Sequence, residues 1–413
     1  MTSKNSSILI TGGNGFLGNL LVTSLLKKTN KNLVLLLRGK RFNREFILKR
    51  ILNELNTGGS TLTQTEEKRI ILCPLPEEDD LSHCLSFLKN LQIQEIVHSA
   101  GCVSYFDKKK LIDGNENLTQ KILDLGCHLQ IEKFFFISTA FSCGLVDGLI
   151  KEDLHDEPKK DPTDYTKSKR NTEKIVAESG LPFVIIRPSV VIGHSQTGHY
   201  SGRPYGLYQF YFSVERFLVS KYRSIMHIFA PKTPLHFLHQ DAFQKGFMAA
   251  YKHLKAGSIF NLVSPSTKLP SMNGIWRYWI KHCFKPKKAF LYENFKEVPF
   301  QKLDDKEKLW LEMTATNQEI GSIPWNFETN HLEFLKKKGL NFPETSLEST
   351  FHCSSYFIRQ SNRIQKYLQT IPKDQNDCPE MVERNGSRGL KGVDSFAAFL
   401  FLATQTTPLL FPY

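Results

Sequence analysis

The sequence predicts an α/β fold in which a doubly wound parallel sheet carries a smaller C-terminal substrate subdomain. Short apolar segments alternate with amphipathic helical segments over the first 195 residues. These short segments are apolar throughout, which is typical of parallel strands covered by helices on both faces. The first of them runs directly into a glycine-rich turn, ITGGNGFLG. Sheets of this kind bind their ligands at the carboxyl ends of the strands.

The expected strands are SILIT, NLVLLL, RIILC, EIVHSA, KFFFIST and PFVIIRP. The segments between these strands have apolar residues at helical spacing and are expected to be helices. They are FLGNLLVTSLLKK, the region around 42–55, LSHCLSFLKNL, the region around 109–128 and residues 161–179. We expect residues 1–195 to form the dinucleotide-binding domain and 196–372 the substrate subdomain. Within the latter, 225–265 is expected to return to the sheet, because GSIFNLVS follows a helical pattern as a further strand. The polar, turn-rich segment 374–393 predicts a linker, so 373–413 is expected to be linker and tail.

Composition limits the classes of partner. Lys and Arg number 54 against 41 Asp and Glu, a net charge of +13. This balance favours acidic partners, which include phosphorylated cofactors, CoA or phosphopantetheine esters, nucleic acid and anionic membranes, but it does not choose among them. On the motifs described below we expect an acyl thioester as the partner and no nucleic acid. The eight cysteines contain no CxxC pair and no zinc-ligand spacing, so we expect reduced thiols and no metal site.

The two chain ends bear on localisation. The N-terminal MTSKNSSILITGG lacks the apolar core of a signal peptide, so a cytoplasmic protein is expected. At the other end, DSFAAFLFLATQTTPLLFPY is the one segment that resembles a membrane segment. Its unbroken apolar run is far shorter than the roughly 20 residues of a spanning helix. A docked tail or a poorly ordered end is favoured over a membrane contact.

The glycine turn predicts a dinucleotide site because a strand precedes it and a helix follows. Gly12 would permit the tight turn, Gly15 would let the backbone approach a pyrophosphate, and Gly18 would let the helix pack against the strand. The helix N-terminus would add free N–H groups and partial positive charge. The alternative is a glycine-rich turn without a ligand. The other residues expected in this cofactor loop are Thr11, Gly13, Asn14, Phe16 and Leu17.

The end of the second strand favours NADP(H) over NAD(H). An acidic residue there would bind the adenosine ribose hydroxyls, but LLLRGKR places Arg38 at this position. A guanidinium suits a 2′-phosphate through paired N–H donors. Lys40, Arg41 and Arg50 would add to the positive field. The alternative is that Arg38 is a surface residue and that either cofactor is accepted.

A candidate catalytic group follows the fifth strand. KFFFISTAFSCG places Ser138 and Thr139 at the strand end, and Tyr165 and Lys169 share one face of the next helix. Hydride addition to a carbonyl carbon leaves charge on oxygen, and a proton must reach it. We expect Lys169 to lower the pKa of Tyr165 and to hold ribose hydroxyls, while Thr139 binds the substrate oxygen.

The motifs TGGNGFLG, HSAG, ISTAF, YTKSK and IIRPSVVIG occur in the order and spacing of the extended short-chain dehydrogenases/reductases. The chain most resembles the thioester reductase and fatty acyl-CoA reductase branch, the male sterility type, over about residues 7–265. The resemblance implies NADPH-dependent reduction of an acyl thioester, bound to CoA or to a carrier protein, to an aldehyde or alcohol. It implies catalytic roles for Thr139, Tyr165 and Lys169, and cofactor contacts from Leu75, His98, Ala100, Gly101, Pro188, Ser189, Val190 and Val191.

Some residues depart from the family pattern. The usual Asp-Leu pair after the third strand is replaced by CPLPEEDDL, which leaves Leu75 alone as a counterpart. Two other classes of function therefore remain open. One is a sugar-nucleotide epimerase or a hydroxysteroid-type dehydrogenase. The other is a non-catalytic NADP-sensing regulator, although such proteins generally lack the Tyr/Lys pair.

Other residues have structural interpretations beside functional ones. We expect His98 to be packed and to orient its loop, Asn115 to steady local backbone, and Asp241 to cap a helix. His236 and His239 would either reach a substrate or lie in the core. The same two interpretations, an acyl channel or an aromatic core, apply to Tyr205, Tyr208, Phe210, Tyr211 and Phe212. Nothing marks Cys102 or Cys143 as a nucleophile, and we expect a solvated helix face at Lys167, Arg170 and Lys174.

Overall fold

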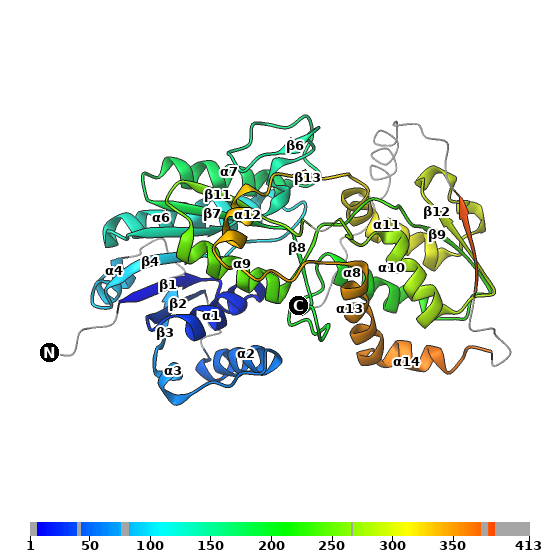
Figure 1. Cartoon of the computed structure of the whole chain (residues 1–413), viewed down its shortest axis with the longest axis horizontal. Helices are drawn as coiled ribbons and strands as arrows, with labels where there is room; N and C mark the ends of the chain where they lie inside the picture. The colour runs from blue at the N-terminus through cyan, green and yellow to red at the C-terminus, as the bar shows by residue number, and fades with distance from the viewer. Residues whose placement is uncertain (1–5, 39–42, 76–81, 266, 373–378, 385–413) are drawn as a thin grey trace.

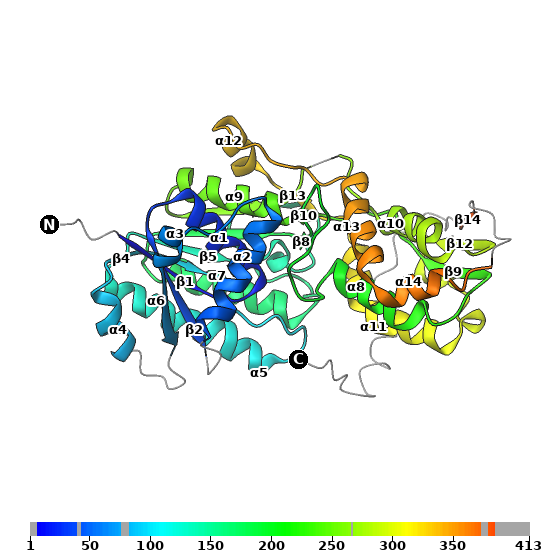
Figure 2. The same cartoon turned by 90° about the horizontal axis from the view of Figure 1, so that it is seen from below.

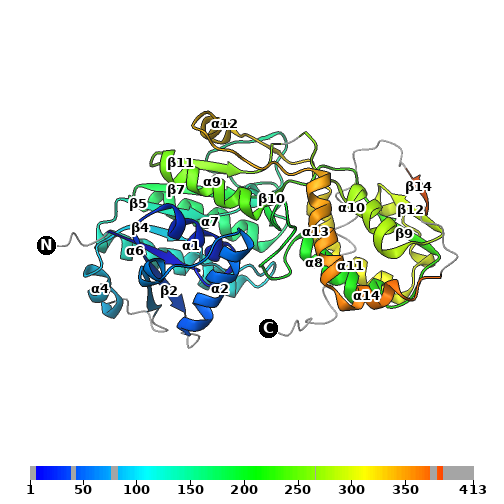
Figure 3. The same cartoon turned by 60° about the horizontal axis from the view of Figure 1, so that its bottom comes forward.

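A computed structural model of the chain describes residues 6–38, 43–75, 82–265, 267–372 and 379–384. The chain forms two lobes that lie side by side in three views (Figures 1, 2 and 3). We call them the sheet lobe, which holds the N-terminal residues 6–192, and the second lobe. The second lobe is built mainly from residues 207–229, 272–321, 347–372 and 379–384.

The sheet lobe contains a seven-stranded parallel sheet among the described residues, in the order β11-β7-β5-β4-β1-β2-β3. The strands are β1 (Ser7–Thr11), β2 (Asn32–Arg38), β3 (Ile70–Leu75), β4 (Ile93–His98), β5 (Lys133–Ile137), β7 (Phe183–Pro188) and β11 (Ser258–Leu262). The order reverses at β1 and β4, the crevice in which doubly wound folds bind ligands. The predicted fold class and all six expected strands are confirmed.

Helices cover both faces of the sheet (Figure 1). One face packs against α1 (Phe16–Lys28), α2 (Arg44–Thr57), α9 (Gln240–His253) and α12 (Asn330–Lys337). The other packs against α4 (Ser82–Lys89), α6 (Leu118–Leu129) and α7 (Asp164–Glu178). The strands are buried nearly throughout because both faces are covered, which explains their continuous apolar sequences.

The second lobe has a three-stranded parallel sheet in the order β14-β12-β9, from β9 (Ile225–Phe229), β12 (Lys288–Tyr292) and β14 (Glu380–Arg384). Around it lie α8 (Leu207–Ser213), α10 (Met272–Trp279), α11 (Asp305–Gly321), α13 (Leu347–Gln360) and α14 (Asn362–Leu368), with the π-helices η3 (Val214–Leu218) and η4 (Ile280–Phe284). The core of this lobe is rich in aromatic side chains, among them Trp276 and Trp279.

Two segments differ from the sequence-based expectation. Ile225–Phe229 was expected to return to the large sheet but pairs with β12 in the second lobe, whereas Ser258–Leu262 does pair with β7. Glu380–Arg384 was expected to be part of a linker but pairs with β12 as β14. Both strands are short and lie far along the chain from their partners, so local sequence gives no signal for the pairing.

Short elements complete the fold. Two small parallel pairings join β8 (Val190–Ile192) to β10 (Phe237–His239) and β6 (Leu149–Ile150) to β13 (Asn326–Phe327). The remaining elements are α3 (Gln64–Lys68), α5 (Lys108–Leu111), the π-helix η1 (Ile112–Asn117), and the 3-10 helices η2 (Ala140–Cys143), η5 (Phe295–Glu297) and η6 (Phe300–Lys302).

None of the helices that the structure describes is long and apolar enough to cross a bilayer. The apolar C-terminal segment 394–413 lies outside the described residues.

Candidate active site

A cavity of about 930 Å³ lies where residues from both lobes meet. Its wall includes the loops that follow β1, β4, β5 and β7, so it opens at the carboxyl ends of the central strands. This is the position at which a doubly wound sheet binds its ligands. The second lobe contributes Phe210, Thr314, Asn317 and Gln318 to the same wall.

The glycine loop after β1 leaves room only for backbone. Gly12 has φ +71°, and a Cβ on it would lie 2.7 Å from the Ala100 nitrogen. A Cβ on Gly18 would lie 1.9 Å from the carbonyl oxygen of Gly12. Helix α1 starts after Gly15 without a side-chain cap, so its first N–H groups are not claimed by a side chain. These features fit a dinucleotide, whose pyrophosphate such N–H groups bind.

Two buried side chains behind the loop hold it in place. Thr11 Oγ1 lies 2.6 Å from His98 Nδ1, and His98 Nε2 lies 2.8 Å from Thr119 Oγ1. The hydroxyl oxygen of Thr11 also accepts hydrogen bonds from the backbone N–H groups of Ser99 and Ala100. Burial, then the charge of Lys169, lowers the pKa of His98 to about 3. A neutral, fully bonded His98 therefore orients the loop, as the sequence predicted.

The basic residues expected at the adenosine end lie in different places. Arg38 is the last residue of β2, is exposed, and is paired in register with Leu75 at the end of β3. Neither lines the cavity, whereas Arg50 of α2 does. Lys40 and Arg41 lie outside the described residues.

Helix α7 starts just ahead of the candidate catalytic pair. Thr163 caps it by accepting a hydrogen bond from the Thr166 N–H at 3.2 Å. The Asp164 N–H donates to the carbonyl oxygen of Tyr105 at 3.0 Å, which ties the helix start to the loop after β4. Tyr165 and Lys169 follow on one face of α7, and both line the cavity.

The electrostatics of the pair differ from the sequence-based expectation. Burial, with smaller effects of Tyr105, Cys102 and Tyr205, raises the pKa of Tyr165 rather than lowering it. Lys169 Nζ donates to the carbonyl oxygen of Ile137 at 2.8 Å and lies 4.1 Å from the centre of the Phe136 ring. Burial lowers the pKa of Lys169 to about 7, which Glu173 only partly opposes. Burial therefore dominates the pKa of both side chains.

Thr139 lies between β5 and η2 on the cavity wall, and its hydroxyl oxygen accepts a weak hydrogen bond from the Phe141 N–H at 3.4 Å. The neighbouring Ser138 donates to Glu173, which forms a fully buried ion pair with Arg187 at 2.6 Å. Burial would raise the pKa of Glu173, but Arg187 and the hydrogen bonds hold it below its ordinary value. This network fixes β5, β7 and α7 to one another behind the site.

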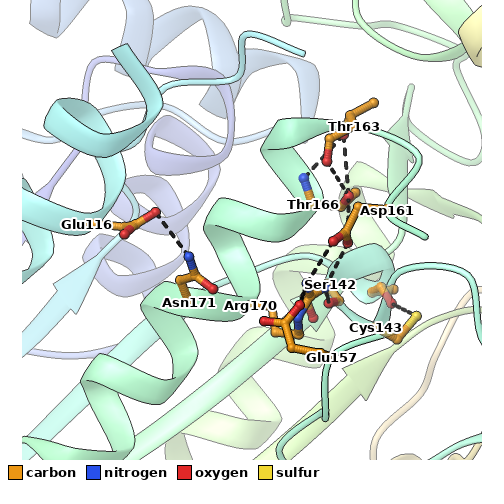
Figure 4. Close-up of polar contacts among 10 residues, drawn as sticks. Glu116, Ser142, Cys143, Glu157, Asp161, Thr163, Thr166, Arg170 and Asn171 are labelled. Atoms are coloured by element: carbon orange, nitrogen blue, oxygen red, sulfur yellow. Dashed lines mark hydrogen bonds and ion pairs between the residues drawn. The ribbon is translucent and has the colours of Figure 1, made fainter. Parts of the chain in front are cut away.

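Arg170 corrects one sequence-based expectation. It was expected on a solvated helix face with Lys167 and Lys174, but its side chain is 0% exposed. Figure 4 shows it pointing to Asp161, which it contacts at 2.7 Å, with Glu157 and the Ser142 carbonyl nearby. An arginine is tolerated there because its donors are matched to a carboxylate. Lys167 is exposed and Lys174 is partly exposed.

The loop after β4 is fixed at both ends. Asn115 accepts a hydrogen bond from the Cys102 N–H at 2.7 Å and donates to the Cys102 carbonyl, so it steadies backbone as expected. Further along the loop, the Tyr105 hydroxyl donates to Asn317 Oδ1 at 2.9 Å. Asn317 belongs to α11, so this hydrogen bond joins the two lobes at the cavity wall.

The residues with two interpretations divide between them. Tyr205 lines the cavity, Phe210 both lines it and packs in the core of the second lobe, Tyr208 and Tyr211 are in that core, and Phe212 is exposed.

The contacts of His236, His239 and Asp241 decide between the alternative roles expected for them. His236 lines the cavity and contacts the Trp325 carbonyl at 3.0 Å. His239 is buried between Gly193 and Ser349. Asp241 does not cap α9 but accepts hydrogen bonds from the N–H and hydroxyl of Ser195.

The structure thus gathers most of the expected site residues around one cavity. Those on its wall are Gly12, Asn14, Gly15, Phe16, Leu17, Gly18, Arg50, Ala100, Gly101, Thr139, Tyr165, Lys169, Pro188, Ser189, Val190 and Val191. Those away from it are Thr11, Gly13, Arg38, Leu75 and His98.

Sequence reasoning missed Tyr105, Arg203 and Asn317 on the wall. Only Arg203 had a local signal, the flanking Gly202 and Pro204 of a turn. Among the described residues, no group of three His, Cys, Asp or Glu side chains is placed to hold a metal ion.

Comparisons with known proteins agree with this architecture. The terminal reductase domain of the myxalamid PKS-NRPS pathway superposes with a TM-score of 0.66 at 20% identity, covering 87% of this chain and 92% of that one. A thiolation-reductase di-domain from an archaeal non-ribosomal peptide synthetase gives 0.68 at 17%, covering 88% and 76%. UDP-glucuronic acid 4-epimerase from Bacillus cereus gives 0.58 at 22%, covering 86% and 100%. At such identities the likeness shows the fold alone. No curated protein matches the sequence significantly.

The family model described as male sterility protein, an NAD-binding domain, matches residues 10–237, more than half of the chain. The matched region holds the glycine loop, the loop after β4, the end of β5 and the Tyr165/Lys169 helix. The chain belongs to the male sterility protein family of NAD-binding domains.

Proposed function

We propose that the protein is an NADPH-dependent oxidoreductase that reduces an acyl thioester, bound to CoA or to a carrier protein, to an aldehyde or alcohol. One observation carries the proposal: Thr139, Tyr165 and Lys169 line the same cavity as the glycine loop. A hydroxyl, a phenol and an amine beside a dinucleotide loop are the groups that carbonyl reduction requires.

The glycine loop and the N-terminus of α1 would hold the pyrophosphate, and Pro188 to Val191 would lie beside the nicotinamide. Bound NADPH would supply the hydride that the carbonyl carbon accepts. Protonation of the oxygen then gives a hemithioacetal, whose C–S bond breaks as the hydroxyl proton passes to sulfur, which releases the thiol of CoA or of the carrier arm and leaves the aldehyde. Arg38, at the carboxyl end of β2, supports NADPH over NADH because no acidic residue stands there to bind ribose hydroxyls. Arg50 adds positive charge to the cavity wall.

The side chains divide the remaining work. Tyr165 donates its hydroxyl proton to the substrate oxygen, and its raised pKa keeps the phenol protonated at neutral pH, the state that a donor needs. Thr139 donates a hydrogen bond to the same oxygen. Lys169 holds ribose hydroxyls, with Ile137 as its second acceptor. His98 does not exchange protons, because both ring nitrogens have partners and its pKa is far below neutral.

The cavity wall supports an acyl substrate. The cavity wall has apolar surface from Phe141, Leu235, Phe237, Ile320 and Trp325, which suits an acyl chain better than a sugar. One of the two reductase domains named above is paired with a thiolation domain in a non-ribosomal peptide synthetase, which supports a carrier-bound thioester as the substrate. The epimerase likeness makes a sugar nucleotide the competing substrate class.

The test is a substrate panel. Purified protein would be mixed with NADPH or NADH and with acyl-CoAs, aldehydes or UDP-sugars, and cofactor oxidation and products would be followed. We expect acyl-CoAs to be consumed with NADPH. Conversion of a UDP-sugar without thioester consumption would replace the proposal with an epimerase, and equal rates with NADH would remove the NADPH assignment.

A further inference from the structure

Two arginines from distant parts of the chain line the same cavity. Arg50 comes from α2, one helix beyond the glycine loop, and Arg203 comes from the segment between β8 and α8. Neither guanidinium forms an ion pair within the described ranges of the chain. Burial, then the charge of Arg203, lowers the pKa of Arg50. Arg50 is partly buried, so the nearby charge of Arg203 disfavours its charged form, and an anionic ligand beside the two guanidinium groups would favour that form.

The segment that carries Arg203 is held in place by tyrosines. The Tyr200 ring packs edge-on against Phe16, the first residue of α1, with ring centroids 4.8 Å apart, and stacks on Tyr208 at 3.6 Å. The Tyr200 hydroxyl donates to the Arg203 carbonyl at 2.8 Å. A Cβ on Gly202 would lie 2.4 Å from the Tyr200 ring, so a larger residue at position 202 would force this ring to move. Arg203 is therefore positioned beside the start of α1.

One acidic residue lies near the pair. Glu54 lines the cavity one turn after Arg50 and attracts it, but burial raises the pKa of Glu54. Its carboxyl receives a hydrogen bond from Gln240 at 3.3 Å. A carboxyl whose charge is disfavoured by burial neutralises only part of two guanidinium charges, and the start of α1 adds further positive potential.

We propose that Arg50 and Arg203 form a clamp that binds a phosphate group of a ligand in the cavity. The inference rests on the proposed function, because the phosphate belongs either to the dinucleotide or to the CoA or phosphopantetheine arm of the thioester. Guanidinium groups hold phosphate oxygens through paired N–H donors. Arg203 is thus a binding residue that the second lobe's connecting segment brings to the cofactor loop.

The experiment measures binding, which does not require turnover. Dissociation constants of NADPH, NADH, CoA and pantetheine, which lacks a phosphate, would be measured by calorimetry for the wild-type protein, Arg203→Gln and Arg50→Gln. Arg216→Gln, at an exposed arginine outside the cavity, is the matched control. Thermal unfolding would verify that each variant folds. Since Arg203 is exposed, Arg203→Gln tests the clamp even if Arg50→Gln does not fold.

We expect Arg203→Gln to weaken one phosphate ligand by roughly tenfold to a hundredfold, with Arg216→Gln unchanged. If only NADPH binds more weakly, the clamp holds the 2′-phosphate. If NADPH and NADH binding weaken equally, the clamp holds the pyrophosphate. If CoA binds more weakly while the binding of pantetheine and of both cofactors is unchanged, the clamp holds a phosphate of the CoA or phosphopantetheine arm. Binding of all four ligands as in the wild type would overturn the clamp. A wild-type protein that binds NADPH but reduces no thioester would overturn the proposed function alone.

Discussion

The sheet lobe and the second lobe are stabilised by different cores. Aliphatic residues such as Ile8, Leu20 and Ile186 fill the flat space between the sheet and its helices. In the second lobe, Phe210, Trp276 and Trp279 pack edge-to-face around a small sheet. The three strands of that sheet come from segments far apart in the sequence, whereas β1, β2, β3, β4, β5 and β7 of the large sheet follow one another along the chain with helices between them.

This difference indicates that the two lobes contribute differently to the candidate site. Regular parallel strands fix the positions of their carboxyl ends, so the sheet lobe can hold Thr139, Tyr165 and Lys169 in a constant arrangement. The second lobe supplies cavity wall from α8 and α11, whose positions depend on side-chain packing. We therefore expect chemistry and cofactor binding to depend on the sheet lobe, and substrate choice to depend on the second lobe.

The largest effect is expected from Tyr165→Phe, which removes the proposed proton donor from the sheet lobe. Turnover should fall by about 10² to 10⁴, the usual contribution of a positioned acid, while NADPH affinity stays unchanged. The rate of NADPH oxidation measures turnover, and a binding titration measures NADPH affinity. Tyr278→Phe removes a hydroxyl from the second lobe outside the cavity and should leave turnover intact. If Tyr165→Phe keeps wild-type turnover, the sheet lobe does not carry the donor.

Lys169→Met tests the buried amine of the sheet lobe. An unfolded lysine keeps its proton to about pH 10, whereas folded Lys169 loses it near its pKa of about 7. Between these values the unfolded chain binds more protons, so wild-type stability rises with pH.

The stability of the wild type relative to Lys169→Met should therefore increase by about 2 to 3 kcal/mol from about pH 6 to about pH 9. Urea unfolding at both pH values measures it. The exposed Lys281 of the second lobe provides the control, because Lys281→Met should show no such change. A relative stability that does not vary with pH would mean that Lys169 keeps an ordinary pKa.

Gly18→Ala tests the cofactor loop, because a Cβ at this position meets the Gly12 carbonyl oxygen at 1.9 Å. The loop must shift, and NADPH should bind between about tenfold and a hundredfold more weakly. A fluorescence titration of bound NADPH measures the change. Gly58→Ala is the matched control, since its Cβ would make only an ordinary contact at 3.5 Å. Unchanged affinity in Gly18→Ala would contradict the assignment of this loop to the dinucleotide.

Tyr105→Phe tests the link between the lobes and should have the smallest effect. It removes the hydrogen bond to Asn317 Oδ1, which is typically worth about 1 kcal/mol. The KM for the thioester should rise about fivefold, with NADPH affinity unchanged. Steady-state kinetics of Tyr105→Phe, Asn317→Leu and the double variant form a cycle. Fully additive effects would show that this contact does not couple the second lobe to the cavity.

Local sequence was sufficient for the strands of the large sheet, for the glycine loop and for the helix face that carries Tyr165 and Lys169. Continuous apolar runs predict buried parallel strands, and the glycine spacing predicts the loop that approaches the Ala100 backbone. The i, i+4 spacing of Tyr165 and Lys169 places both on one face of α7, which the structure turns to the cavity. These features follow from periodicity and from the steric freedom of glycine, which short stretches of sequence fully express.

Tertiary structure alone decided the rest. Arg170 is buried because Asp161 and Glu157 come back to meet it, and the pKa of Tyr165 is raised because the loop after β4 and the segment after β8 enclose it. The pairing of β14 with β12 and the approach of Arg203 to Arg50 also join distant parts of the chain. Burial and charge are properties of what surrounds a residue, and its sequence neighbours supply only a small part of those surroundings.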